Sequence, residues 1–205
     1  MKHALSGALP GWEAQRKMIN FSRPRAEDVE TIDPGANIGA VLILIYPKGG
    51  EDHVVLILRN TYDGVHSGQV GLPGGKVEKS DRDLMATALR EAHEEVGILP
   101  AEVEILGGLS PVYIPPSRFL VYPYVGISEK RPDFQRDPTE VAKIIEAPVE
   151  KFLDPAYRKE KTIFVNSEKT ELAIKYFDIQ DQVVWGATAM IMSEFSEIVK
   201  NTRGL

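Results

Sequence analysis

Residues 74–98 read GGKVEKSDRDLMATALREAHEEVGI, a glycine pair followed by an acidic stretch with helical periodicity. Ser80 stands three residues before Asp83, a spacing typical of a helix N-cap with an acidic partner. Gly97 is the residue type that most often ends a helix. The apolar positions of this stretch are Leu84, Ala88, Leu89, Ala92 and Val96. Together these features predict a capped amphipathic helix.

The predicted helix carries three carboxylates on one face. Glu91 and Glu95 are four residues apart, and Glu94 is three residues from Glu91. Their Cβ atoms would lie about 5–6 Å apart, where like charges destabilise a helix by a few tenths of a kcal/mol per pair. A divalent cation would reverse this repulsion, and oxygen-only ligands suit a hard ion such as Mg²⁺.

The acidic run also fits an ordinary solvated helix face, with Arg90 pairing with Glu94 at i,i+4. The preceding Gly74 and Gly75 favour a binding site, because adjacent glycines let the backbone approach a phosphate closely just before a helix begins. The residues themselves leave both interpretations open.

The flanking sequence alternates strand and helix patterns. Runs rich in Val, Ile and Leu predict strands at 38–46 and 53–59, joined by a turn at 47–50, and further strands at 103–109, 119–127, 162–165 and 172–179. Helical spacing is found at 9–19, 139–146, 149–153 and 186–199, and the turn-rich residues 60–75 are expected to form an ordered surface loop. The fold class is therefore α/β or α+β with a mixed sheet.

Length and composition limit the remaining possibilities. The 205 residues fit a single domain at 35–205, preceded by an N-terminal helix and irregular extension at 1–34. The absence of cysteine excludes thiolate nucleophiles and thiolate metal sites. The net charge of -6 disfavours nucleic-acid binding. Without a leader pattern or a long apolar run, we expect a cytoplasmic protein that does not enter a membrane.

Gly75 followed by residues 90–98 (REAHEEVGI) resembles the Nudix box, the loop-helix-loop motif of Nudix hydrolases. The second half of the family's pattern is matched in full. The first half differs, because the interval from Gly75 to Arg90 is one residue longer than in the pattern and Arg82 stands where the pattern has Glu. The resemblance implies a Nudix-type α/β/α sandwich with a mixed β-sheet.

Within the family, the chain resembles the coenzyme A pyrophosphatase branch. The longer box, the stretch 67–75 (SGQVGLPGG) and the segment 185–189 (WGATA) are similar to that branch. Two positions depart from it, since Ile57 and Gly64 replace a Thr and an Arg of the branch's pattern. These departures weaken the assignment to coenzyme A but not the assignment to pyrophosphatases.

The resemblance implies a metal-dependent pyrophosphohydrolase acting on a small-molecule nucleotide. Glu91, Glu94 and Glu95 would hold Mg²⁺ or Mn²⁺, and Arg90 would orient these carboxylates, although a purely structural ion pair is equally compatible with Arg90. The implied reaction converts coenzyme A or acyl-coenzyme A to 3′,5′-ADP and a 4′-phosphopantetheine product. ADP-ribose or a nucleotide sugar is the alternative substrate, and a non-catalytic nucleotide-binding module is the alternative from another class. A homodimer is left open.

Further residues are candidates for binding the substrate. Arg59, His66, Gly74 and Gly75 flank or begin the box and could contact the phosphates or the base, although exposed polar loop residues often have no such role. Asp83 and Glu140 could each add a carboxylate, but capping a helix is the plainer role of both. Four aromatic residues could stack on adenine or belong to the core: Tyr113, Phe119, Tyr122 and Tyr124.

Overall fold

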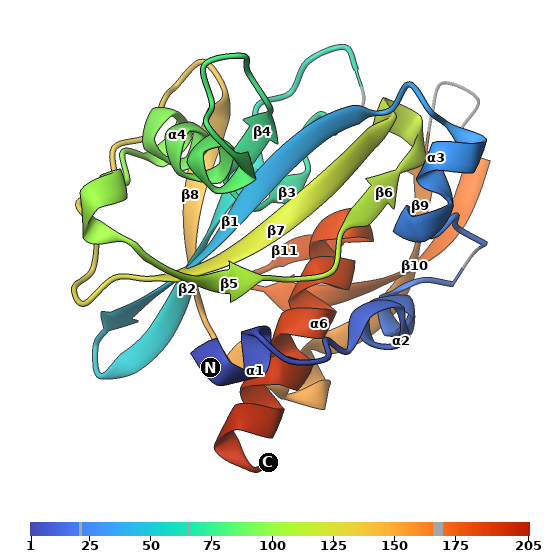
Figure 1. The fold of residues 1–205 in the computed structure, drawn as a ribbon. Helices are drawn as coiled ribbons and strands as arrows, with labels where there is room; N and C mark the ends of the chain where they lie inside the picture. The colour runs from blue at the N-terminus through green and yellow to red at the C-terminus, as the bar shows by residue number, and fades with distance from the viewer. Residues whose placement is uncertain (21, 65, 166–169) are drawn as a thin grey trace.

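The computed structural model describes residues 1–20, 22–64, 66–165 and 170–205. In these residues, eight strands form a mixed sheet and three form a second sheet (Figure 1). The strands of the first sheet are β1 (Asn37–Lys48), β2 (Glu51–Arg59), β3 (Val70–Gly71), β4 (Gly74–Lys76), β5 (Glu104–Gly108), β6 (Val112–Ile114), β7 (Phe119–Ile127) and β8 (Val141–Pro148). The second sheet contains β9 (Arg158–Val165), β10 (Thr170–Ile179) and β11 (Gln182–Trp185).

The order of the large sheet is β3-β2-β1-β7-β5, with β4 paired to β1, β6 to β7 and β8 to β2. The pair β1 and β7 is parallel, from Asn37 opposite Phe119 to Ile45 opposite Ile127. The other strand pairs of this sheet among the described residues are antiparallel, so the sheet is mixed as predicted. Every residue from 42 to 46 in β1 is buried, which is typical of a strand covered on both faces.

The two faces of β1 pack against different helices. Leu42 and Leu44 belong to one buried cluster with helix α4 (Leu84–Val96), whereas Ile43 and Ile45 belong to another with helix α6 (Gly186–Arg203). Figure 1 shows α4 and α6 on opposite sides of the sheet. Helix, sheet and helix thus form three layers, which confirms the predicted α/β/α sandwich.

The helix predicted at residues 139–146 is wrong, because this segment forms strand β8. Val141, Ile145 and Ala147 are buried at odd-numbered positions, as expected of a strand with one face on the core. The segment pairs antiparallel with β2, from His53 opposite Pro148 to Arg59 opposite Val141. Tertiary pairing with β2 therefore overrides the local helical spacing.

The other predicted elements are recovered with shifted bounds. Helix α5 (Glu150–Leu153) corresponds to the helix predicted at 149–153, and α6 extends beyond residue 199. The expected loop at 60–75 contains β3 and part of β4. The strands that the sequence patterns did not predict are β3, β4, β6, β8 and β11.

The N-terminal segment is more ordered than expected. In place of one helix over 9–19 there are α2 (Gly11–Gln15) and the 3₁₀ helix η1 (Arg16–Met18). The expectation of an irregular stretch before Pro34 is wrong in part, because it contains the 3₁₀ helix η2 (Ala26–Asp28) and helix α3 (Val29–Ile32). The remaining short elements are α1 (Lys2–Leu5), η3 (Pro100–Glu102), η4 (Pro115–Ser117) and η5 (Pro155–Tyr157). The division at residue 34 stays a prediction.

None of the helices in the described ranges combines the length and the apolar character that crossing a bilayer requires.

Candidate active site

Helix α4 forms where the sequence predicts it, with a different cap. The N-cap is Asp83, whose carboxylate accepts a 2.8 Å hydrogen bond from the backbone N–H of Ala86. Ser80 lies outside the helix and donates to Glu78, so the expected cap at Ser80 is wrong. Asp83 has the cap position because its backbone is extended while the next residue is already helical. Gly97 ends the helix in the left-handed conformation, as predicted.

Glu95 is a buried carboxylate at the last turn of α4. Its side chain is 2% exposed and lies 3.4 Å from the Arg59 guanidinium. The backbone N–H of Gly74 donates a 2.8 Å hydrogen bond to the other carboxylate oxygen. Burial raises the pKa of Glu95 to about 7, and the opposing effects of Arg59 and the Gly74 N–H do not offset it. The surroundings of Glu95 therefore only partly compensate the charge of its ionised form.

Glu91 lies one turn before Glu95, packed against the glycine pair. A Cβ atom at Gly75 would stand 2.5 Å from the Glu91 carboxylate, so only glycine leaves room for it. Burial raises the pKa of Glu91, Arg90 lowers it, and the negative charges of Glu94 and Glu140 raise it further. Gly75 therefore provides the space in which the Glu91 carboxylate sits.

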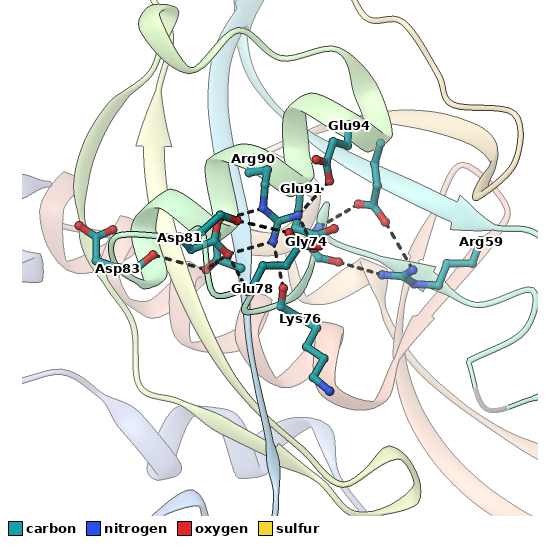
Figure 2. A network of polar contacts seen from close by, with 12 residues as sticks. Arg59, Gly74, Lys76, Glu78, Asp81, Asp83, Arg90, Glu91 and Glu94 are labelled. Carbon is teal, nitrogen blue, oxygen red and sulfur yellow. Dashed lines mark hydrogen bonds and ion pairs between the residues drawn. The ribbon is translucent and has the colours of Figure 1, made fainter.

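Arg90 holds this end of the site together, as Figure 2 shows. Its Nη1 atom donates to Glu91 at 3.0 Å and to Glu94 at 2.9 Å. Its Nε and Nη2 atoms donate to the two carboxylate oxygens of Asp81 at 2.9 and 3.0 Å. The Arg90 guanidinium holds the pKa of Asp81 well below its usual range, mainly through these hydrogen bonds. Arg90 thus has the position expected of a residue that orients the helix carboxylates.

Asp81 is the residue of this network that the sequence patterns did not single out. Its side chain is 4% exposed and also accepts hydrogen bonds from Thr87 and from the backbone of Glu78. The available signal was its place in the loop that leads into the predicted helix, nine positions before Arg90. Spacing along a loop does not specify which side chains meet, so the signal was weak.

The predicted substrate residues divide into two groups. Gly74, at φ 151°, packs where a Cβ atom would lie 2.3 Å from the carbonyl oxygen of Ala40. Arg59 donates to the carbonyl of Gly74 at 3.2 Å and pairs with Glu95. Gly74, Gly75 and Arg59 therefore all contact the carboxylate site or its backbone, while their role toward a substrate stays a prediction.

His66 lies in the loop that leads to the site, with its backbone at φ 69°. Its ring nitrogens lie 2.9 Å from the Ser117 hydroxyl and 3.2 Å from the Gln69 side-chain oxygen. Positive φ is uncommon outside glycine and costs energy that the surrounding contacts must offset. Ser117 and Gln69 fix the ring, which makes His66 an ordered loop residue.

The weaker candidates also have defined positions. Glu140 is exposed, and its charge raises the pKa of both Glu91 and Glu95, so it lies near both carboxylates. Tyr113 is buried and its hydroxyl donates to Asp33 at 2.7 Å, a structural use of the ring. The other aromatic candidates are partly buried in β7: Phe119, Tyr122 and Tyr124.

The donor set suits a hard divalent cation. Glu91 and Glu95 offer only oxygen atoms as ligands. Burial raises the pKa of both carboxyl groups, and the neighbouring negative charges raise it further. Glu94, 55% exposed and paired with Arg90, lies on the outer side of the pair. Within the described ranges, no group of three His, Asp or Glu side chains is already arranged to hold a metal ion. To bind a cation, the carboxylates would therefore have to give up contacts with Arg90 and Arg59 and turn these oxygen atoms toward the metal.

The segment that contains these residues matches a known protein family. The family model of the NUDIX domain matches residues 36–166, which include Glu91, Glu94 and Glu95. The chain belongs to the Nudix family. The predicted family is thus confirmed, and the box residues lie within the matched Nudix domain.

Curated Nudix relatives cover much of the chain. Two Arabidopsis thaliana proteins, "Nudix hydrolase 22, chloroplastic" and "Nudix hydrolase 15, mitochondrial", are 36% and 35% identical over 78% and 82% of this chain. The chain spans 54% and 60% of the length of these two relatives, less than two thirds. Nudix hydrolase NudL of Photorhabdus laumondii is 34% identical over 66% of this chain and 71% of its own length.

Solved Nudix structures share the fold. RenU, a Nudix hydrolase of M. smegmatis, has a TM-score of 0.56 at 15% identity and covers 81% of this chain and 87% of its own. A C. elegans Ap4A hydrolase has a TM-score of 0.54 at 15% identity and covers 80% and 98%. At this identity the likeness shows the fold alone, and it confirms the predicted Nudix-type sandwich.

Proposed function

We propose that this Nudix chain is a metal-dependent pyrophosphohydrolase that cleaves the diphosphate bond of a nucleoside diphosphate derivative. The observation that carries the proposal is the pair of partly buried Glu91 and buried Glu95 behind the Gly74-Gly75 backbone, where burial raises the pKa of both carboxylates. Two partly buried like charges destabilise the free protein, and a divalent cation compensates them. The presence of all three box carboxylates, including Glu94, favours catalysis over a non-catalytic nucleotide-binding module.

The proposed cation is Mg²⁺ or Mn²⁺, held by Glu91, Glu94 and Glu95. When bound, it supplies positive charge against the diphosphate and polarises its oxygen atoms. Arg90 orients Glu91 and Glu94 through one guanidinium nitrogen. One of the carboxylates accepts the proton of the attacking water.

The favoured substrate is coenzyme A or an acyl derivative, cleaved to 3′,5′-ADP and a 4′-phosphopantetheine product. Two separate stretches carry the resemblance to the coenzyme A branch, residues 67–75 and 185–189. These stretches meet in the structure, because the hydroxyl of Thr188 donates to the carbonyl of Val70 at 3.1 Å. Gln69, from the first stretch, also contacts the His66 ring. The contact supports treating the two stretches as parts of one feature.

ADP-ribose or a nucleotide sugar is the second candidate substrate. Ile57 and Gly64 stand where the coenzyme A branch has Thr and Arg, which favours this alternative. Both substrates contain the same diphosphate and would use the same carboxylates.

The test is chromatography of reactions that contain coenzyme A, ADP-ribose, NADH and a nucleotide sugar at equal concentrations with Mg²⁺. Release of 3′,5′-ADP from coenzyme A is the expected result. Exclusive cleavage of ADP-ribose would refute the coenzyme A assignment. Cleavage of none of the four would favour the binding-module alternative and overturn the enzyme proposal.

We further propose that the partner is a small nucleotide rather than a nucleic acid, in line with the net charge of -6. The cytoplasmic location and the homodimer stay predictions. Size-exclusion chromatography with light scattering would settle the oligomeric state.

A further inference from the structure

Arg23 is a partly buried cation that forms no ion pair with a carboxylate of the described residues. It lies between η1 and η2, and its Nε and Nη2 atoms donate to the carbonyl of Tyr113 at 3.0 and 2.7 Å. Burial lowers the pKa of Arg23 to about 10. Among the described residues, no carboxylate forms an ion pair with Arg23 and no atom accepts a hydrogen bond from its Nη1 atom. A neutral donor would satisfy one carbonyl equally well, so the charge itself needs another explanation.

The segment that receives Arg23 also holds His66. Tyr113 is in β6, which continues into η4, and Ser117 at the end of η4 contacts the His66 ring at 2.9 Å. Arg23 lies close enough to His66 for its positive charge, with that of Arg59, to add to the effect of burial in lowering the pKa of His66. Arg23 and His66 are therefore neighbours fixed by the same short segment.

Arg59 connects this pair to the carboxylates, since it contacts Glu95 at 3.4 Å. The site thus extends from Glu91 and Glu95 through Arg59 to His66 and Arg23, with acidic groups at one end and nitrogen donors at the other. Asp33 also contacts this segment, because it pairs with Arg118 and accepts a hydrogen bond from the Tyr113 hydroxyl. Arg118 already compensates the charge of Asp33, so within the described ranges the positive charge of Arg23 has no carboxylate partner.

We propose that Arg23, beside His66, binds a phosphomonoester that the substrate carries in addition to the diphosphate that is cleaved. The inference rests on the proposed function, because the carboxylates fix where the diphosphate lies. A phosphate accepts charge-assisted hydrogen bonds from a guanidinium, and the free Nη1 atom supplies a donor for it. Coenzyme A carries such a phosphomonoester on its ribose, whereas ADP-ribose and nucleotide sugars do not. Arg23 is thereby a specificity-determining residue.

The test compares coenzyme A with dephospho-coenzyme A, which share the diphosphate and differ in the phosphomonoester. We expect the wild type to favour coenzyme A in kcat/KM by about tenfold or more, and Arg23→Gln to bring this ratio close to one. Arg25→Gln is the matched control, because exposed Arg25 pairs with Glu27, and it should keep the wild-type ratio. An unchanged ratio in Arg23→Gln, or no preference in the wild type, overturns the proposal.

Arg23→Lys covers the case in which Arg23→Gln does not fold, which circular dichroism would reveal. Lysine keeps the charge but lacks the planar pair of donors of a guanidinium. We therefore expect its kcat/KM ratio for the two substrates to be lower than that of the wild type but still above one. If Arg23→Lys keeps the wild-type preference for coenzyme A and binds dephospho-coenzyme A as well as the wild type does, the role of the guanidinium is overturned.

A second measurement separates this inference from the proposed function. If the wild type cleaves neither substrate, the proposed function fails, and Arg23 is tested by calorimetry with 3′,5′-ADP and 5′-AMP without divalent cation. We expect about tenfold tighter binding of 3′,5′-ADP, lost in Arg23→Gln. Equal affinities in the wild type overturn the phosphomonoester site independently of catalysis.

Discussion

Two glutamates buried on opposite sides of the sheet have opposite surroundings. Glu194 on α6 is 0% exposed and accepts hydrogen bonds from the backbone N–H groups of Gly11 and Ser110, the Ser110 hydroxyl and the Gln15 amide. Glu95 on α4 is 2% exposed, accepts one backbone hydrogen bond and lies 3.4 Å from Arg59. Glu194 is satisfied by four protein donors, whereas Glu95 is left with unused capacity for a ligand.

Burial alone therefore does not identify a functional carboxylate. Glu194 has a structural role, because it connects α6 to the N-terminal segment and to Ser110. Burial raises the pKa of Glu95, and the negative charges of Glu91 and Glu140 raise it further. This combination is expected of a cation-binding site without its cation.

Removing divalent cations should have the largest effect. We expect turnover of the best diphosphate substrate to fall to background in excess chelator and to return with Mg²⁺ or Mn²⁺, because the carboxylates alone repel the diphosphate. The Glu194 side of the molecule should be unaffected, so circular dichroism should show the same fold with and without chelator. Undiminished turnover in excess chelator would contradict the cation assignment.

Glu95→Gln and Glu91→Gln should each lower the rate at saturating Mg²⁺ by at least about a hundredfold. Glutamine keeps the shape, and at position 95 its oxygen can still accept from the Gly74 N–H, so the fold should persist. Steady-state kinetics and thermal unfolding of both variants measure the two effects. Near-normal turnover in either variant would remove that residue from the ligand set.

The stability of the cation-free protein should fall as the pH rises from about 4.5 to 7. The folded pKa of Glu95, about 7, lies above its ordinary value of 4.5, so the folded state holds a proton that the unfolded state has already released. The stabilisation is complete below pH 4.5 and is lost as the pH rises through 7, with a total of about 3 kcal/mol.

Urea unfolding in chelator across this pH range, for the wild type and Glu95→Gln, isolates the contribution of Glu95 from that of other titrating groups. The variant should show a flatter profile. Parallel profiles would mean that Glu95 is not protonated in the folded state near neutral pH.

Glu194→Gln should lower the free energy of unfolding by about 2 kcal/mol, because the amide nitrogen would meet buried donors in place of an acceptor oxygen. Turnover per folded molecule should stay at the wild-type level. Glu197→Gln, on the same helix and paired with Lys17 at 3.2 Å, is the control, with an expected effect below about 1 kcal/mol. Equal losses in both variants in denaturant unfolding would contradict the structural role of Glu194.

Local pattern was enough to predict the central strands, α4 and the helix end at Gly97, because alternation, helical spacing and glycine chemistry act within a few residues. The same reasoning failed at residues 139–146, where pairing with β2 rather than local spacing decides the structure. It also placed the cap at Ser80, since both Ser80 and Asp83 are good cap residues and spacing alone does not choose between them.

The carboxylates of the site followed from their spacing on one helix, whereas the contacts that hold them did not. Arg59, at the end of β2, and Glu95 meet beside the backbone of Gly74, and Arg23 comes from a segment distant in sequence. Such pairings depend on tertiary structure, which no single-sequence pattern specifies. Asp81, the anchor of Arg90, belongs to the same category.

Asp81→Asn should have the smallest effect, because it acts on the site only through Arg90. Asn replaces one acceptor oxygen by a donor, so the paired hydrogen bonds from Nε and Nη2 of Arg90 cannot both form. Arg90 would then hold Glu91 and Glu94 less firmly, and we expect about a tenfold lower kcat with a higher Mg²⁺ concentration for half-maximal activity. Asp83→Asn is the matched control in the same loop, because asparagine caps a helix as well as aspartate does. A Mg²⁺ titration of both variants is the deciding measurement. If Asp81→Asn lowers only the unfolding temperature and its Mg²⁺ dependence equals that of the wild type, Asp81 supports the fold and does not position the site.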